Sequence, residues 1–231
     1  LLLSSIMGID TRTTMDMDTC IKGIELSEDK LYKKESTILY DKNGEEFAKL
    51  GSEFREMITY DQLPEVLVNA IIATEDSRFF QHNGFDLPRF AKASVQQVLS
   101  KLFGIGGNAG GASTLTMQIS KNAFTSTESE GIEGIIRKFT DIYVAINEIE
   151  KNYSKEEIIE FYVNSYCLGG NIYGVEQASV SYFGKHAKDL NLAEAAIIAG
   201  LFQAPNKYSP VSNPENAAYR RGIVLKLMVK H

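Results

Sequence analysis

A short stretch about a third of the way along the chain, residues 73–86, brings acids, an arginine, a histidine and three phenylalanines together within fourteen residues. Glu75 stands at the end of a predicted amphipathic helix, whose apolar face repeats at helical spacing over 63–74. A carboxyl group close to aromatic rings is partly desolvated, which raises its pKa toward the range in which a general base works. Glu75 is therefore a candidate general base, and a structural ion pair with Arg78 is the alternative.

Hydroxyl side chains and a lysine mark a second candidate site at 111–122, which reads GASTLTMQISKN. Serine and threonine at a helix start satisfy its free backbone N–H groups, and the same helix start attracts anions. The segment predicts either an ordinary helix cap or, together with Lys121, a site for an anion.

A third group lies on the most regular helical pattern of the chain, residues 132–149. Arg137 and Asp141 are four residues apart and Lys138 and Asp141 three apart, so all three share one face, which we expect to be exposed. An intrahelical salt bridge worth about 0.3–0.5 kcal/mol would explain these residues. A cationic site for an anion is the functional interpretation.

Taken together, these stretches resemble the motifs of the peptidoglycan glycosyltransferases (glycosyltransferase family 51), which form the polymerase domain of class A penicillin-binding proteins and the monofunctional transglycosylases. The first motif of that family is matched by Glu75, Asp76, Phe79, His82, Gly84 and Asp86. The second motif resembles residues 111–122, with Met117 in place of a glutamine. The third resembles the pattern Arg-Lys-x-x-Glu, with Asp141 in the glutamate position. Residues 154–174 and 182–205 resemble the later blocks, although by themselves they indicate only helix packing.

The resemblance implies a mainly α-helical, lysozyme-like domain over residues 35–231, with a short N-terminal β-hairpin and a small membrane-facing lobe at about 87–112. Residues 1–34 would form a separate N-terminal segment. Its apolar run 1–7 is interpreted as the stub of a membrane anchor or the end of a signal segment.

The reaction that the resemblance implies is the polymerisation of lipid II, in which the 4-hydroxyl group of an acceptor sugar attacks C1 of a lipid-pyrophosphate-linked donor with inversion. Glu75 would take the proton, and Asp141 would orient the cations or share a divalent metal ion (Mg or Mn) with the pyrophosphate. The cations expected to bind the pyrophosphate are Lys121, Arg137 and Lys138. The residues expected to shape the two sugar sites are Asp76, Phe79, His82, Thr114, Gln118 and Asn122. No organic cofactor is expected, because the donor is already activated.

The implied partners are lipid II, the nascent glycan strand, a membrane surface, and a following transpeptidase domain or other cell-wall synthesis proteins. The implied location is the outer face of the bacterial cytoplasmic membrane, with an N-terminal transmembrane helix as anchor. Two other classes of protein fit the same residues. One is a lysozyme-like enzyme that cleaves glycan, which also needs a glutamate in a helical cleft. The other is a non-catalytic domain that binds lipid II or glycan, suggested by the departures at Met117 and Asp141.

Composition and patterning limit the remaining choices. A formal charge of −6 argues against nucleic acid as a partner, and an anionic substrate would need a local cationic cluster. Cys20, Cys167 and the three histidines show no ligand spacing, so we expect no structural zinc site. The elements that must position the candidate residues are a hairpin around Asn43 and Gly44 and helices at 63–75, 87–103, 132–149 and 154–164. The glycine-rich segment 104–111 is expected to be a flap or hinge.

Overall fold

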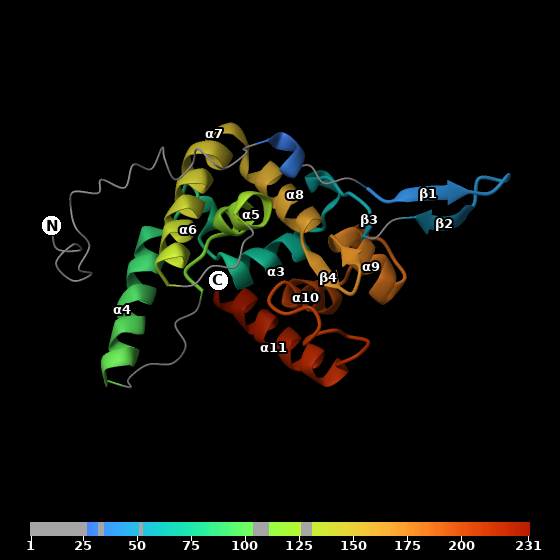
Figure 1. The fold of residues 1–231 in the computed structure, drawn as a ribbon. Helices are drawn as coiled ribbons and strands as arrows, with labels where there is room; N and C mark the ends of the chain where they lie inside the picture. The colour runs from blue at the N-terminus through green and yellow to red at the C-terminus, as the bar shows by residue number, and fades with distance from the viewer. Residues whose placement is uncertain (1–26, 32–34, 51–52, 104–110, 126–130) are drawn as a thin grey trace.

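The computed structural model describes residues 27–31, 35–50, 53–103, 111–125 and 131–231 (Figure 1). The predictions for the first 26 residues, including Cys20, and for nearly all of the glycine-rich segment concern residues outside these ranges. Within the described ranges the chain is mainly α-helical with a few short strands, which confirms the predicted fold class. No helix in these ranges is both long enough and apolar enough to cross a lipid bilayer.

The predicted N-terminal hairpin is confirmed. Strand β1 (Thr37–Tyr40) pairs in antiparallel fashion with β2 (Glu46–Leu50), with Leu39 opposite Ala48. The turn is closed by a hydrogen bond from Asp41 N to Glu45 O at 2.8 Å, and Gly44 takes the positive φ of 83° that the Asn-Gly pair predicted. Figure 1 shows the hairpin projecting from the helical body.

A second, three-stranded sheet was not predicted. It has the order β3 (Phe54–Arg55), β5 (Ile172–Tyr173), β4 (Cys167–Gly169), with β3 parallel and β4 antiparallel to β5. Strands of two or three residues are too short to show the alternation of polar and apolar residues by which strands are recognised in a sequence.

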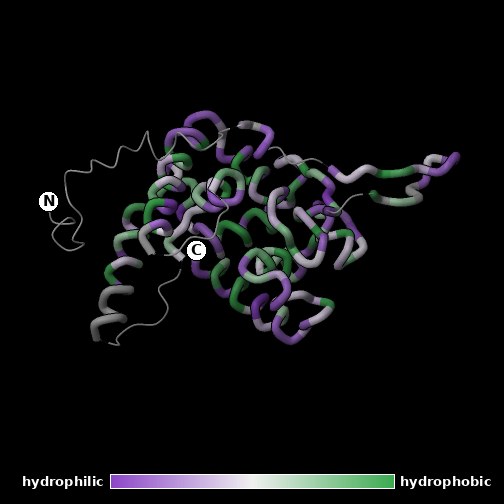
Figure 2. Tube along the Cα trace, viewed as in Figure 1, coloured by the Kyte–Doolittle hydropathy of each residue, from purple (hydrophilic) through white to green (hydrophobic). Residues whose placement is uncertain are grey.

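Helix α3 (Glu65–Glu75) is the central element, and it packs against α10 (Leu192–Leu201) and α11 (Pro214–Lys230). Its residues Leu67, Ala70 and Ile71 are buried, as the sequence periodicity predicted. Helix α10 is apolar on nearly all sides, and Figure 2 shows the hydrophobic colouring gathered where it meets α3. Because α3 is held by this packing, its last residue, Glu75, has a fixed position.

The helices α4 (Leu87–Phe103) and α5 (Leu115–Phe124) begin at the predicted caps. Asp86 Oδ1 accepts a hydrogen bond from Arg89 N at 3.0 Å, and Thr114 Oγ1 accepts one from Met117 N at 3.2 Å. Side-chain oxygens at these positions satisfy N–H groups that the helix leaves unpaired.

The predicted regular helix at 132–149 is interrupted. Helix α6 (Gly131–Val144) continues into a π-helical segment (Ala145–Ile149) and then into α7 (Glu150–Asn152). The loop after α3 lies against this segment, since a Cβ at Gly84 would come within 3.0 Å of the carbonyl group of Ala145. Gly84 has a φ of 83°, so glycine is required there for both conformation and space.

The orientation predicted for α6 was wrong. Its charged face is turned inward: Asp141 is 3% exposed, whereas the apolar Ile135 and Phe139 are 42% and 48% exposed. The reason is that the charged residues find polar partners on neighbouring segments, which a count along one helix cannot show.

Helix α8 (Lys155–Ser165) begins at the predicted capping box of Ser154 and Glu157, and α10 begins at a second box of Asn191 and Glu194. Helix α9 (Val175–Phe183) links the small sheet to α10. Single 3-10 turns complete the described elements at Glu28–Lys30 (η1), Tyr60–Gln62 (η2), Phe79–Gln81 (η3) and Ala187–Asp189 (η5).

Candidate active site

A pocket of about 790 Å³ lies where α3, α4, α5 and α11 meet. Each helix contributes a side chain to its wall: Glu75 from α3, Arg89 from α4, Gln118 from α5 and Arg220 from α11. Among the described residues that line it, Glu75 has the only carboxylate side chain. The lining arginines and lysines are Arg78, Arg89, Lys92, Arg220 and Lys230. The pocket is therefore locally cationic on a chain whose formal charge is −6.

Glu75 is held by a short chain of hydrogen bonds. Gln118 Nε2 donates to Glu75 Oε2 at 3.2 Å, and the buried Tyr162 hydroxyl donates to Gln118 Oε1 at 3.3 Å, which fixes the orientation of the amide. Burial raises the pKa of Glu75, and the bond from Gln118 and the charges of Arg220 and Arg89 offset part of this rise. The alternative in which Glu75 pairs with Arg78 is wrong, because the ion pair of Arg78 is with Asp86, at 3.4 Å from Nε to Oδ2.

Asp76 lies beneath the pocket rather than on its wall. It is fully buried and accepts hydrogen bonds from Leu115 N at 3.0 Å and from Arg89 Nη1 at 3.4 Å, while His82 Nε2 lies 3.1 Å from both of its oxygens. Its carboxylate therefore ties the end of α3 to the start of α5, where the helix dipole favours an anion. Phe79 is also fully buried, with Lys155 Nζ 4.2 Å from its ring centroid.

The start of α5 is fixed by Thr114. Its buried hydroxyl donates to Gly84 O at 2.6 Å while it caps the helix. Met117, the departure from the second motif, is 2% exposed and part of the core. In this structure Asp76, Phe79, His82 and Thr114 thus lie outside the described lining of the pocket, whereas Gln118 lies within it.

The cations of α6 gather around Asp141. Its Oδ1 accepts a hydrogen bond from the hydroxyl of Thr125, the C-cap residue of α5. Burial raises the pKa of Asp141, and the Thr125 bond and the charges of Arg137, Lys138 and Lys121 offset part of this rise. Burial lowers the pKa of Lys138, and the charge of Asp141 acts in the opposite direction.

Arg137 is the cation of this group with unused hydrogen-bonding capacity. Its Nε and Nη1 atoms are buried and have no hydrogen-bond partner in the described structure. A buried, unpaired donor is costly to a protein and rare, so it calls for a functional explanation. Lys121 and Asn122 lie on the exposed side of α5.

Two contacts connect the cation group to the pocket. Lys138 Nζ donates to Ser113 Oγ at 2.6 Å, and Ser113 lines the pocket. The second link is electrostatic: burial raises the pKa of the Tyr166 hydroxyl, and the charges of Glu75 and Asp141 raise it further. The structure thus brings Glu75, Gln118 and the α6 group to one region.

Arg220 was missed in the sequence. It is 9% exposed, and its neighbour Gly200 in α10 leaves room for it, since a Cβ there would lie 2.8 Å from Arg220 Cγ. The sequence pattern could have revealed it, because Arg220 shares one helical face with two small or apolar residues. The buried residues of α11 are Ala217, Arg220 and Val224. An arginine within a buried stripe needs an anionic partner, and here the charge of Arg220 acts on Glu75.

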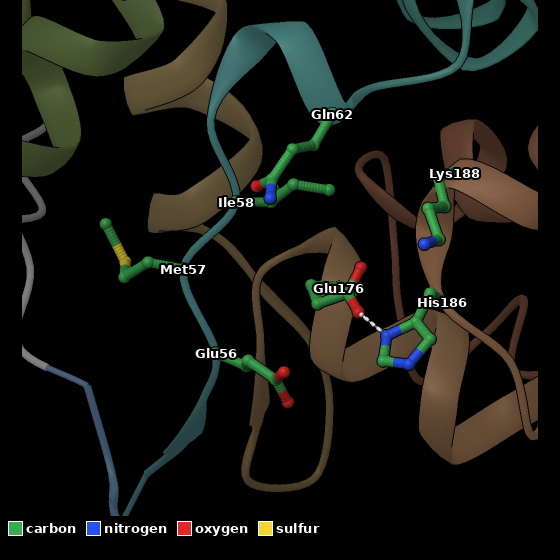
Figure 3. Close-up of a pocket in the computed structure, with 7 residues that line it drawn as sticks. All are labelled: Glu56, Met57, Ile58, Gln62, Glu176, His186 and Lys188. Carbon is green, nitrogen blue, oxygen red and sulfur yellow. Dashed lines mark hydrogen bonds and ion pairs between the residues drawn. The ribbon is translucent and has the colours of Figure 1, made fainter.

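Another group of ligating residues lies away from this site, in a pocket of about 250 Å³ (Figure 3). The side chains of Glu56, Glu176 and His186 place possible ligand atoms within 4.8 Å of one another. Glu176 Oε1 lies 2.6 Å from His186 Nδ1, and its Oε2 accepts from Ala187 N at 2.9 Å, so Glu176 already links α9 to η5. With Lys188 also lining the pocket, we assign the group a structural role. This group could not be predicted from the sequence, because Glu56 lies far along the chain from Glu176 and His186.

Comparisons with known proteins agree on one family. The model of the family described as "Transglycosylase" matches residues 43–229. Penicillin-binding protein 1A/1B of Bacillus subtilis (strain 168) is 40% identical over 206 residues, which cover 89% of this chain and 21% of that protein. Penicillin-binding protein 1A of Streptococcus oralis is 40% identical over 203 residues, covering 88% of this chain and 31% of that protein.

Penicillin-binding protein 1A of Neisseria gonorrhoeae is 41% identical over 192 residues, covering 83% of this chain and 23% of that protein. The chain therefore spans less than a third of the length of these relatives. The solved structure of penicillin-binding protein 1A from Haemophilus influenzae aligns with a TM-score of 0.45 and 22% identity, over 85% of this chain and 18% of that one.

Proposed function

Since this chain belongs to the transglycosylase family of peptidoglycan glycosyltransferases, we propose that it polymerises lipid II into glycan strands in the cationic pocket around Glu75. The observation that carries the proposal is the composition of the described pocket lining, in which one half-buried carboxylate faces a set of arginines and lysines. One base and a surrounding positive field suit a reaction in which a hydroxyl group loses a proton and a pyrophosphate leaves.

The bond-forming step uses Glu75 as general base. The 4-hydroxyl oxygen of the acceptor sugar forms a bond to C1 of the donor from the side opposite the pyrophosphate, the C1–O bond to the pyrophosphate breaks, and the proton passes to Glu75. Burial supports this role because it makes the carboxylate more basic, and the hydrogen bond from Gln118 holds it in one position.

The leaving pyrophosphate would be bound by the cations of α5 and α6. Arg137 offers two buried donors that have no partner among the described residues, and Lys138 donates to Ser113, which lines the pocket. Lys121 adds a third positive charge close to Asp141. Fixed cations stabilise the negative charge that gathers on the leaving group, and an arginine can engage two phosphate oxygens at once.

The sugar-site residues divide into two groups under this proposal. Gln118 lies on the pocket wall, and Asn122 lies on the exposed side of α5. Both can contact a sugar there. Asp76, Phe79, His82 and Thr114 are buried or nearly so, and they act by holding Glu75 and the start of α5 in place.

Asp141 is the candidate ligand for a divalent metal ion shared with the pyrophosphate. Mg²⁺ is commonly held by one or two carboxylates together with substrate phosphates, so one carboxylate would suffice. However, Asp141 is already bonded to Thr125 and surrounded by three cations, and no group of three ligating side chains among the described residues includes it. A role for Mg²⁺ or Mn²⁺ at Asp141 is tested by chelation, which should abolish activity if a metal ion is required.

We expect Asp141→Asn to lower kcat/KM, because its carboxylate balances the three cations and accepts from Thr125. Asp141→Glu should not improve the enzyme: a longer side chain in this buried position would displace the carboxylate by about 1 Å, and such a displacement can cost about 10²-fold in rate. Thr125→Val should reproduce part of the loss, and Thr125→Ser should restore it. The measurement is steady-state kinetics of each variant. An Asp141→Asn variant as active as the parent would show that this carboxylate has no role in the site.

The two rival functions are weaker. Glycan hydrolysis by a pair of carboxylates requires a second acid across the pocket, and the described lining offers only Glu75. A purely binding domain would not explain a base held by Gln118 in a desolvated position. Incubation with lipid II separates the three: long glycan supports the proposal, short fragments from added glycan support a hydrolase, and no reaction despite binding supports a binding domain.

We also propose that α4 contacts a membrane surface at the outer face of the cytoplasmic membrane, as part of a longer protein with an N-terminal anchor and a transpeptidase domain or other cell-wall synthesis proteins as partners. Helix α4 stands at the side of the molecule in Figure 1, with Leu87 and Val95 exposed by 62% and 58%. Apolar side chains that water would otherwise surround favour an interfacial position.

Leu87→Glu with Val95→Glu should weaken vesicle binding by about tenfold or more, since burying such a side chain contributes about 1.5–3 kcal/mol. The melting temperature should change little, because both residues are exposed. Leu192→Glu, at a 52% exposed position in α10, is the matched control. Equal vesicle binding by the variant and the control, measured by co-sedimentation, would show that α4 is not the contact.

A further inference from the structure

A second large pocket, which we call the distal groove, lies between the small sheet, α9 and the segment that joins α10 to α11. Its volume is about 610 Å³, within the usual range for ligand sites. Its lining includes three apolar side chains and two amides: Phe54, Ile172, Val211, Asn171 and Asn206. Among the described lining residues none is charged, in contrast to the pocket around Glu75.

The groove combines apolar surface with amides and hydroxyls. Phe54, Ile172 and the 74% exposed Val211 supply the apolar part. Asn171 and Asn206 are exposed at the edge, and serine hydroxyls lie beside them. The backbone on both sides is fixed, because Phe54 N donates to Asn171 O at 2.7 Å and Asn213 Nδ2 donates to Asn206 O at 2.9 Å.

This chemistry suits an uncharged sugar. A pyranose ring has apolar C–H faces that pack on aromatic and aliphatic side chains, and hydroxyl or acetamido groups at its edge that exchange hydrogen bonds with amides. An ionic ligand would lose its hydration without gaining a counter-charge here.

One short segment of the chain contributes residues to the linings of both pockets. Gln203 lines the pocket around Glu75, and Asn206, three residues later, lines the distal groove. A strand can reach the distal groove if it leaves the first pocket on the side of Gln203.

We propose that the distal groove binds the neutral sugar backbone of the glycan strand that is made in the pocket around Glu75. This inference rests on the proposed function, because the strand is the product of the proposed polymerisation. Its consequence is that a strand held at a second place dissociates more slowly between additions and grows longer before release.

The first test measures binding without catalysis, with chitotetraose as the probe. In NMR titrations of the purified full protein, the probe should shift signals of the groove. Asn171→Ala and Asn206→Ala should each weaken its binding by about fivefold to tenfold, which corresponds to one or two lost hydrogen bonds. Asn152→Ala is the matched control, because Asn152 is exposed and lies in α7 outside both described linings.

The second test measures strand length with lipid II as substrate. The double variant Asn171→Ala/Asn206→Ala should keep the initial rate of lipid II consumption and yield shorter strands. Unchanged affinity for chitotetraose in the double variant would overturn the inference. Probe signals confined to the pocket around Glu75 would overturn it as well. A groove that binds a polypeptide segment instead of a sugar would likewise show no shift with chitotetraose. Failure of the parent to polymerise lipid II would instead overturn the proposed function, and the chitotetraose titration would still decide the groove.

Discussion

Glu75→Gln should lower the rate of polymerisation by about 10²–10⁴-fold, the usual contribution of a general base. Glutamine has nearly the same size as glutamate, and its amide oxygen can still accept the hydrogen bond from Gln118 Nε2, but it cannot take up a proton as a base. The fold should survive, because α3 is held by Leu67, Ala70 and Ile71 in the core and not by its last side chain.

The same variant should be more stable than the parent at neutral pH. Burial raises the pKa of Glu75 in the folded state above its value in the unfolded chain. The stability that this group contributes is therefore fully present below the unfolded pKa, about 4.3, and is lost as the pH rises through the folded pKa. A neutral glutamine avoids that loss, so the melting temperature of the variant should exceed that of the parent at pH 7 and approach it at low pH.

Glu65→Gln is the matched control, since Glu65 begins the same helix and is exposed. It should change neither rate nor stability appreciably. A Glu75→Gln variant that retains most of its rate would remove Glu75 from the role of base, and one that melts lower than the parent at neutral pH would show that its carboxylate stabilises the fold.

Arg137→Ala should lower kcat/KM by about 10²–10³-fold, as the loss of one fixed donor to a developing charge does in other enzymes. The basis is the pair of buried guanidinium nitrogens that have no partner among the described residues. Because no hydrogen bond to them is lost, the melting temperature should stay the same or rise.

Arg137→Lys should recover only part of the activity, because an ammonium group cannot bind two phosphate oxygens in the planar manner of a guanidinium. Lys226→Ala, which removes an exposed cation of α11, is the control for net charge. An Arg137→Ala enzyme with normal kinetics, or one that unfolds at a much lower temperature, would show that this arginine is structural.

The helices and their caps could be predicted from the sequence because their signals are local. Ser154 with Glu157, Asn191 with Glu194 and Asp86 lie within a few residues of the N–H groups they satisfy. The position of Glu75 at the end of α3 followed from the same local spacing. The residues of the candidate site were gathered by resemblance to the family motifs, and the structure places two of them, Glu75 and Gln118, in the described lining of the pocket.

Features that depend on contacts between distant segments could not be predicted. The buried contacts of Asp76 could not be predicted, because its partners Leu115 and Arg89 come from other helices. The charged side chains of α6 face inward because Lys138 and Asp141 bond to Ser113 and Thr125. The effect of Arg220 on Glu75 depends on the packing of α11 against α3. None of these partners is set by spacing along one helix.

The pH dependence of kcat/KM with lipid II shows whether a desolvated Glu75 is the base. A base must be deprotonated, so the rate should fall on the acid side with a midpoint above the ordinary glutamate value of about 4.3. Gln118→Leu removes the hydrogen bond that lowers the pKa of Glu75, so its acid limb should move to higher pH. An acid limb at the ordinary value, or one that stays in place in Gln118→Leu, would contradict the account.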